Sequence, residues 1–164
     1  MIGLDVTHLA LASEEVQQRV LHGDTREGNG RPHPMRRMFY DLLTFFSGTY
    51  RDVFGFADGP PLHDPLAVAV VLDILGLEDF GFEDGEVEGE KGEEWIVDVV
   101  TDNREEDNQL GRTVLVRQVN GEEAGVRVPR RIRHLDRFWD MIELALQRAQ
   151  IESDKTGIWD RFKS

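Results

Sequence analysis

The chain has 164 residues, of which 40% are hydrophobic and 31% charged, so it has the length of one domain and enough apolar side chains for a core. Its net charge of -13 argues against a surface for nucleic acid or for an anionic membrane, because both repel fixed negative charge. The absence of cysteine excludes disulfide scaffolds, thiolate zinc sites and cysteine nucleophiles. No apolar run reaches the ~18 residues of a membrane span, and the start lacks a basic signal-peptide head, so we predict a soluble, cytoplasmic protein.

The first third of the chain is predicted to hold a short strand and two helices. Ile2, Leu4 and Val6 alternate with other residue types, which indicates a strand. Ser13 suits the N-cap of a helix that ends near Gly23. A longer helix is predicted over residues 35–54, because apolar side chains recur there at steps of three or four: Met38, Leu42, Phe45, Phe46 and Tyr50.

The middle of the chain combines an apolar helix with an acidic stretch. The helix is predicted from Pro65 to Leu75, and its sequence LAVAVVL has no polar face, so we expect it to be buried on every side. Positions 76–110 then hold 14 acidic and 2 basic residues, interrupted by glycines. We predict that residues 78–107 form a solvated surface insertion, and their spacing does not match a calcium-binding loop.

The last third is predicted to contain strands followed by a helix. Runs rich in Val and Ile at 95–101, 113–118 and 126–132 indicate three strands, with Asn120-Gly121 as a hairpin turn between the last two. An amphipathic helix is predicted at 135–149, with Phe138, Ile142, Ala145 and Leu146 facing inward, and residues 151–164 read as a polar tail. Helices and strands in this mixture favour a three-layer α/β fold.

The segment that indicates chemistry is PPLHDPLAVA, in which His63 and Asp64 stand between rigid prolines and the apolar helix. An aspartate before a proline is also a common N-cap, and a loop histidine is often an ordinary hydrogen-bonded residue. A carboxylate at the mouth of a buried helix, however, is costly unless it is bonded or bound to a cation. The neighbouring imidazole titrates near neutral pH, as a general acid should.

This segment resembles the histidine-aspartate motif of the inosine/uridine-preferring nucleoside hydrolases, which cleave the N-glycosidic bond of ribonucleosides. Three further stretches resemble the family in the same order: IGLDVTHLAL, LLTFFSGTYRDVFG, and GRTVLV with LDRFWDMIELAL. The resemblance covers most of residues 1–150, which we interpret as the C-terminal part of a nucleoside hydrolase domain. It implies helices around a mostly parallel sheet.

The resemblance also implies roles for three residues. His63 matches the histidine beside the base, acting as the general acid or as an orienter of the nucleoside. Asp64 matches a carboxylate that binds the catalytic Ca²⁺, and Tyr50 lies near a segment from which some members bring a tyrosine over the base. His8 belongs to the Val-Thr-His segment and is interpreted as structural.

One family motif is missing from the sequence. Members carry an aspartate-rich motif, D-x-D-P-G-x-D-D, which supplies most calcium ligands and the base that activates water, and none occurs here. Because one aspartate cannot give Ca²⁺ its usual six to eight oxygens, we expect the isolated chain to have little or no activity. We expect it to need an N-terminal half or a second copy as partner. The alternatives are a non-catalytic interaction module and an acidic binding module centred on residues 78–107.

Overall fold

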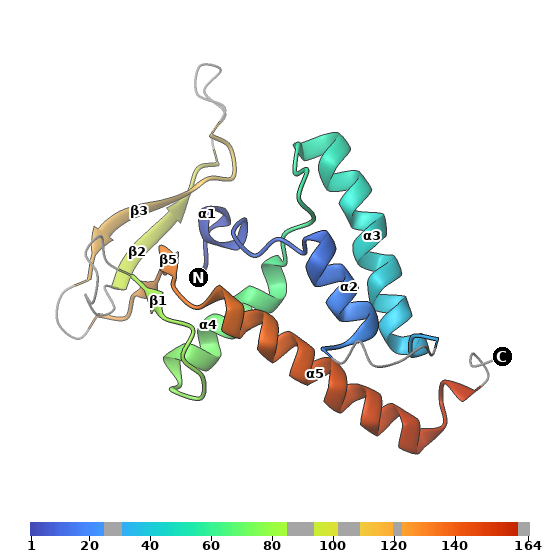
Figure 1. Ribbon diagram of the computed structural model, residues 1–164. Coiled ribbons are helices and arrows are strands. Elements are labelled where there is room, and N and C mark those ends of the chain that lie inside the picture. The colour runs from blue at the N-terminus through green and yellow to red at the C-terminus, as the bar shows by residue number, and fades with distance from the viewer. Residues whose placement is uncertain (25–30, 85–93, 102–108, 120–122, 161–164) are drawn as a thin grey trace.

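The computed structural model describes residues 1–24, 31–84, 94–101, 109–119 and 123–160. Figure 1 shows a helical part and a small β part, joined by α4 and the start of α5. The helices are α1 (Leu4–Thr7), α2 (Glu14–His22), α3 (Pro34–Phe54), α4 (His63–Ile74) and α5 (Leu135–Thr156). The strands are β1 (Phe82–Glu83), β2 (Glu94–Val99), β3 (Thr113–Gln118), β4 (Val126–Arg127) and β5 (Arg131–Ile132). Within the described ranges, no helix combines the length and the apolar character needed to cross a bilayer.

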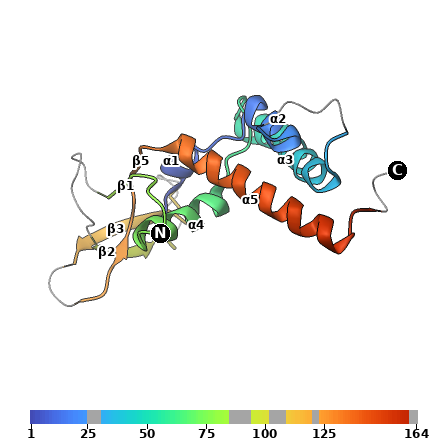
Figure 2. The same cartoon turned by 60° about the horizontal axis from the view of Figure 1, so that its bottom comes forward.

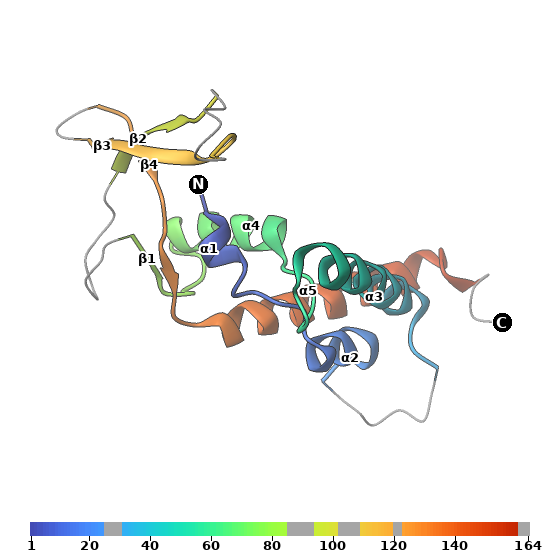
Figure 3. The same ribbon diagram turned by 90° about the horizontal axis from the view of Figure 1, so that it is seen from above.

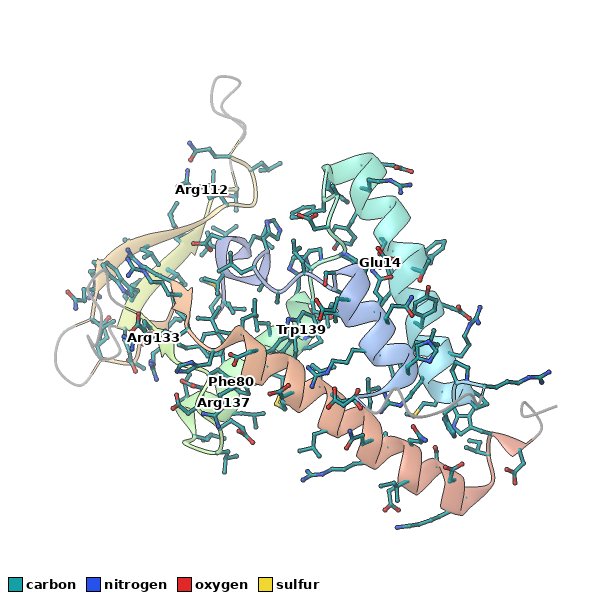
Figure 4. All side chains as sticks on the ribbon, in the orientation of Figure 1. Glu14, Phe80, Arg112, Arg133, Arg137 and Trp139 are labelled. Atoms are coloured by element: carbon teal, nitrogen blue, oxygen red, sulfur yellow. The ribbon has the colours of Figure 1, made fainter. Side chains whose placement is uncertain are left out.

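Helix α5 runs the length of the helical part (Figure 2), and two hydrophobic clusters lie along it. The larger one joins α1, α4, the segment around β1 and the first turns of α5; its buried members are Val6, Ala10, Leu66, Ala69, Val70, Phe80, Phe82 and Phe138. Phe80 and Trp139 mark its position in Figure 4. The smaller cluster joins α2, α3 and the middle of α5 through Val20, Met35 and Leu146. The long last helix therefore holds the two halves of the helical part together.

The expected helices of the first half are confirmed at their ends. The Ser13 hydroxyl accepts a hydrogen bond from the Val16 amide, as an N-cap does, and α2 stops at Gly23, which has a positive φ of 74°. The predicted helix over 35–54 is α3, which runs unbroken to Phe54. α5 begins where predicted, at residue 135, but continues past 149 to Thr156.

The N-terminal strand prediction is wrong, because Leu4–Thr7 forms the short helix α1. A strand leaves its backbone groups unpaired unless a neighbouring strand takes them up. In the described part of the chain, residues 2–6 have no such neighbour. The segment bonds to itself instead: the His8 amide donates to the Leu4 carbonyl at 2.8 Å.

The described strands pair only antiparallel, in the orders β1-β5 and β3-β2-β4, so the mostly parallel sheet that we expected is not seen among them. The α/β composition itself is present. The Asn120-Gly121 turn lies outside the described residues, but β3 and β4 both pair with β2 and not with each other, so the hairpin expectation is wrong. Figure 3 shows β2, β3 and β4 as a layer beside the helices, with the N-terminus next to it. The Met1 amino group donates to the Arg127 carbonyl at 2.8 Å.

The acidic stretch is not a purely solvated insertion, since its first part enters the core. Phe80 is fully buried, and Glu83 and Asp84 are 9% and 1% exposed. Asp84 accepts a hydrogen bond from Arg127 Nε at 2.7 Å, and Glu83 pairs with Arg133. Aromatic side chains close the main cluster here, while basic side chains from the β part neutralise the two buried carboxylates.

Helices α3 and α4 are far more exposed than their apolar sequences predict. On α3 the exposed apolar side chains are Met38, Phe39, Leu42, Phe45, Phe46, Val53 and Phe54. On α4 only Leu66, Ala69 and Val70 are buried, whereas Val68, Val71 and Ile74 are exposed. The expectation that α4 is buried on every side is therefore wrong for this chain. We call these exposed apolar residues of α3 and α4 the uncovered face.

Candidate active site

The loop before α4 is pinned to residues 10–12, so the position of His63 is well defined. The Ala12 amide donates to the Pro60 carbonyl at 2.9 Å, and the Leu62 amide donates to the Ala10 carbonyl at 3.0 Å. Gly59 has a φ of 133°, and a Cβ atom there would lie 2.2 Å from the Ala12 carbonyl oxygen. Only glycine fits this approach, which brings the segment after α1 against the start of α4.

Helix α4 starts at His63, two residues before the predicted Pro65, and its N-cap Leu62 makes no capping bond through its side chain. Asp64 therefore lies inside the first turn and is not the cap. There its negative charge suits the positive end of the helix. The Asp64 side chain is exposed, because α4 is open on one side. The burial cost that favoured a bound cation at this carboxylate therefore does not apply in this structure.

His63 is held by a threonine from α1. Its Nδ1 atom lies 2.8 Å from the Oγ1 atom of Thr7, and Thr7 is only 2% exposed. The same hydroxyl donates a longer bond, 3.4 Å, to the Leu4 carbonyl. Two segments 56 residues apart in the chain are thus joined at the imidazole.

Two rings lie near this imidazole, and a third packs against both of them. The ring of His8 lies 5.5 Å and that of Tyr50 6.3 Å from the ring of His63, between centroids. Phe56 completes the group, 4.7 Å from His8 in an edge-to-face contact and 6.0 Å from Tyr50. We call His8, Tyr50, Phe56 and His63 the ring cluster. These centroid distances are those of aromatic side chains packed on one another, and a planar heterocycle can stack on such a ring in the same way.

The structure thus brings the predicted residues His63 and Tyr50 together, while Asp64 follows His63 in the first turn of α4 with an exposed side chain. It also adds residues that the sequence did not single out. Thr7 precedes His8 in the Val-Thr-His segment, which is the signal that could have indicated it. Phe56 follows Gly55, the left-handed residue with φ of 77° that ends α3, and no sequence pattern marked it.

The pKa of His63 is lowered from its ordinary value of 6.5. Burial of the imidazole is the main cause, and the nearby His8 lowers the pKa further, while the carboxylate of Asp64 opposes both. The ring is therefore mainly neutral at pH 7.

The described residues do not make a complete metal centre. No group of three or more His, Asp or Glu side chains among them is arranged to hold an ion. Asp64 offers a single carboxylate, whereas Ca²⁺ takes six to eight oxygens. The described residues therefore do not fit a whole calcium site.

Comparisons with known proteins agree with the resemblance. The chain is 27% identical over 150 residues to uridine nucleosidase of Saccharomyces cerevisiae, a match that covers 91% of this chain and 40% of the yeast protein. It is 38% identical over 73 residues to a probable ribonucleoside hydrolase of Dictyostelium discoideum, covering 44% and 21% of the two chains. The same identity over 73 residues relates it to the inosine-uridine preferring nucleoside hydrolase of Leishmania major, covering 44% and 20%.

The chain therefore spans less than half the length of these relatives. The family model described as inosine-uridine preferring nucleoside hydrolase matches residues 1–140, which is most of the chain. The chain belongs to the inosine-uridine preferring nucleoside hydrolase family.

Proposed function

We propose that this chain is part of a hydrolase that cleaves the N-glycosidic bond of ribonucleosides of the uridine or inosine type, giving ribose and the free base. Support comes from the family and from relatives named as a uridine nucleosidase and as ribonucleoside hydrolases. The observation that carries the proposal is the ring cluster, in which the imidazole of His63 lies beside the rings of His8 and Tyr50.

The chemistry of the reaction fits these residue types. When the bond between the base nitrogen and the ribose C1′ breaks, positive charge builds on the sugar and negative charge on the departing base. Water supplies the oxygen that bonds to C1′, and a proton must reach the base. His63 is proposed to lie beside the base, giving that proton or orienting the nucleoside, with Tyr50 over the base plane.

We further propose that the chain corresponds to the C-terminal part of such an enzyme and that the remaining part of the fold packs on the uncovered face. The 164 residues lack the aspartate-rich motif, and α3 and α4 expose side chains of core type, such as Phe45 at 69% and Val68 at 59%. Asp64 is proposed as this chain's ligand to Ca²⁺, with the other ligands supplied by the remaining part.

The test begins with the isolated chain and uridine, where we expect little or no release of uracil. The chain is then co-expressed with the part of a full-length relative that it does not match, the part that carries the aspartate motif. We expect calcium-dependent turnover that is lost in His63→Ala and Asp64→Asn. The matched controls His22→Gln and Asp52→Asn change exposed residues of α2 and α3 and should leave turnover unchanged. Robust hydrolysis by the isolated chain would refute the need for a partner.

The uncovered face predicts a separate result in the same experiment. Phe45→Gln should weaken association with the added part while leaving the stability of the chain unchanged within about 0.5 kcal/mol, because this side chain is exposed. Phe138→Ala, at a fully buried position, should instead destabilise the chain by about 3–5 kcal/mol. Association that is insensitive to Phe45→Gln would place the interface elsewhere.

A second candidate function is a non-catalytic interaction module that keeps this part of the fold. The uncovered face favours association, while the single carboxylate Asp64 does not support chemistry by itself. Stable association without turnover would support this reading, and self-association of the chain alone would make a second copy the partner. An acidic binding module at 78–107 is less well supported, because Glu83 and Asp84 are buried in ion pairs.

A further inference from the structure

The contact between Thr7 and His63 differs from the other contacts of the imidazole because it is a short hydrogen bond to a buried group. The Oγ1 to Nδ1 distance is 2.8 Å, and the threonine is 2% exposed. The contacts with His8 and Tyr50 are ring contacts, at centroid distances of 5.5 and 6.3 Å. Thr7 is thus the group that fixes how the imidazole is turned.

The hydroxyl of Thr7 has one hydrogen and two possible partners. The Leu4 carbonyl, 3.4 Å away, can only accept, whereas Nδ1 of a neutral imidazole can donate or accept. Both contacts are satisfied together in one arrangement only: the hydroxyl donates to Leu4 and accepts from an Nδ1–H group of His63. The Leu4 carbonyl oxygen has two lone pairs, so it also accepts a hydrogen bond from the His8 amide at 2.8 Å.

We propose that Thr7 is a positioning residue that holds neutral His63 in the tautomer with hydrogen on Nδ1. Nε2 is then the bare nitrogen, which accepts a hydrogen bond from a bound base and gives a proton to a departing base only after it has itself taken one up. The catalytic meaning of this assignment rests on the proposed function, but the tautomer itself does not. The Thr7 side chain can fix the tautomer of His63 because helix α1, which carries Thr7, is anchored. Val6, the neighbouring residue, is fully buried in the main cluster, and the Thr7 amide donates to the Gly3 carbonyl at 3.1 Å.

The tautomer is measured by NMR on the full chain labelled with ¹⁵N in its histidines. Long-range correlations between ring hydrogens and nitrogens show which nitrogen carries hydrogen, and the His63 signals are assigned by their loss in His63→Gln. Spectra are taken at about pH 8.5, about two units above the ordinary histidine pKa, so that the ring is neutral. Thr7→Val removes the hydroxyl at nearly constant shape, and Thr7→Ser keeps it.

We expect Nδ1–H as the major form in the unmodified chain and in Thr7→Ser. In Thr7→Val the population should move to Nε2–H, the form that histidine favours in water. A merely structural role of Thr7 would not move these nitrogen shifts. A majority of Nε2–H in the unmodified chain would overturn the proposal, as would a Thr7→Val spectrum unchanged at His63. If Thr7→Val does not fold, the spectra of the unmodified chain and of Thr7→Ser still decide which nitrogen of His63 carries the hydrogen. None of these results depends on hydrolysis, so the proposal can fail while the proposed function stands.

Discussion

The ion pair between Arg36 and Glu143 is the most deeply buried one among the described residues, and its removal provides a quantitative test of the fold. Its side chains are 5% and 3% exposed, and two parallel bonds of 3.0 and 2.7 Å join them. The guanidinium also donates to the Val20 carbonyl at 2.9 Å and to Gln150 at 2.8 Å. Helices α2, α3 and α5 are therefore tied together at one charged group.

Glu143→Gln keeps the shape of the side chain and leaves the Arg36 charge buried without a counter-charge. Removing one partner of a buried pair costs about 3–5 kcal/mol, and the amide oxygen retains one bond, so we expect a loss near 3 kcal/mol. The total stability of a domain is about 5–15 kcal/mol, so this loss is a large part of it. Divided by a urea m value of about 1–3 kcal/mol/M, the loss lowers the midpoint of unfolding by about 1–3 M.

Equilibrium urea unfolding followed by circular dichroism gives this quantity. The control is Asp41→Asn on α3, the helix that carries Arg36, and it breaks the Arg37–Asp41 pair. Those side chains are 60% and 55% exposed, so the cost should be below about 1 kcal/mol. The double variant Arg36→Met with Glu143→Leu removes both charges and should cost less than Glu143→Gln alone. A loss below about 1 kcal/mol for Glu143→Gln would show that the pair does not hold the helices together.

Two further predictions concern the approach to His63 and its titration. Gly59→Ala should destabilise the chain by at least about 2 kcal/mol, because the added Cβ would meet a backbone oxygen at a residue with positive φ. Gly48→Ala, where the added Cβ meets open space on α3, should instead stabilise the chain by up to about 1 kcal/mol. Thermal unfolding of both variants measures these changes, and equal effects would contradict the prediction. In an NMR titration, the pKa of His63 should lie below 6.5, rise in His8→Gln and fall further in Asp64→Asn. Because the pKa of this histidine is lower in the folded than in the unfolded state, its contribution to stability is complete above the unfolded-state pKa. That contribution is lost as the pH falls from the unfolded-state pKa through the folded-state pKa. Shifts of the opposite sign in the two variants would refute the assigned causes.

Local signals in the sequence were enough to predict most of the helices. The Ser13 cap and Gly23 define the ends of α2, and the spacing of apolar residues indicates α3. The two longer strands, β2 and β3, follow from runs of β-branched residues. Each of these signals acts within a few residues, through capping bonds, side-chain spacing or backbone preference.

What the sequence did not predict depends on partners far along the chain. The alternation at 2–6 describes which side chains are apolar, but whether a strand forms depends on a neighbour to accept its hydrogen bonds. The pairing order β3-β2-β4 is likewise a matter of long-range contact. For the candidate site, His63 and Asp64 were predicted from one motif, whereas the bond from Thr7 to His63 spans 56 residues.

The uncovered face connects these differences with the proposed function. A sequence such as LAVAVVL predicts burial on every side, yet Val68 is 59% and Val71 52% exposed, and the same helix begins with His63 and the exposed Asp64. The exposed valines and the exposed carboxylate of Asp64 thus lie on the same helix, α4. A single added body that packs on the valines would approach Asp64 as well. Association of the added part with α4 and completion of the proposed site around Asp64 should therefore be lost together. A variant of Val68 that weakens this association should reduce turnover in the same proportion.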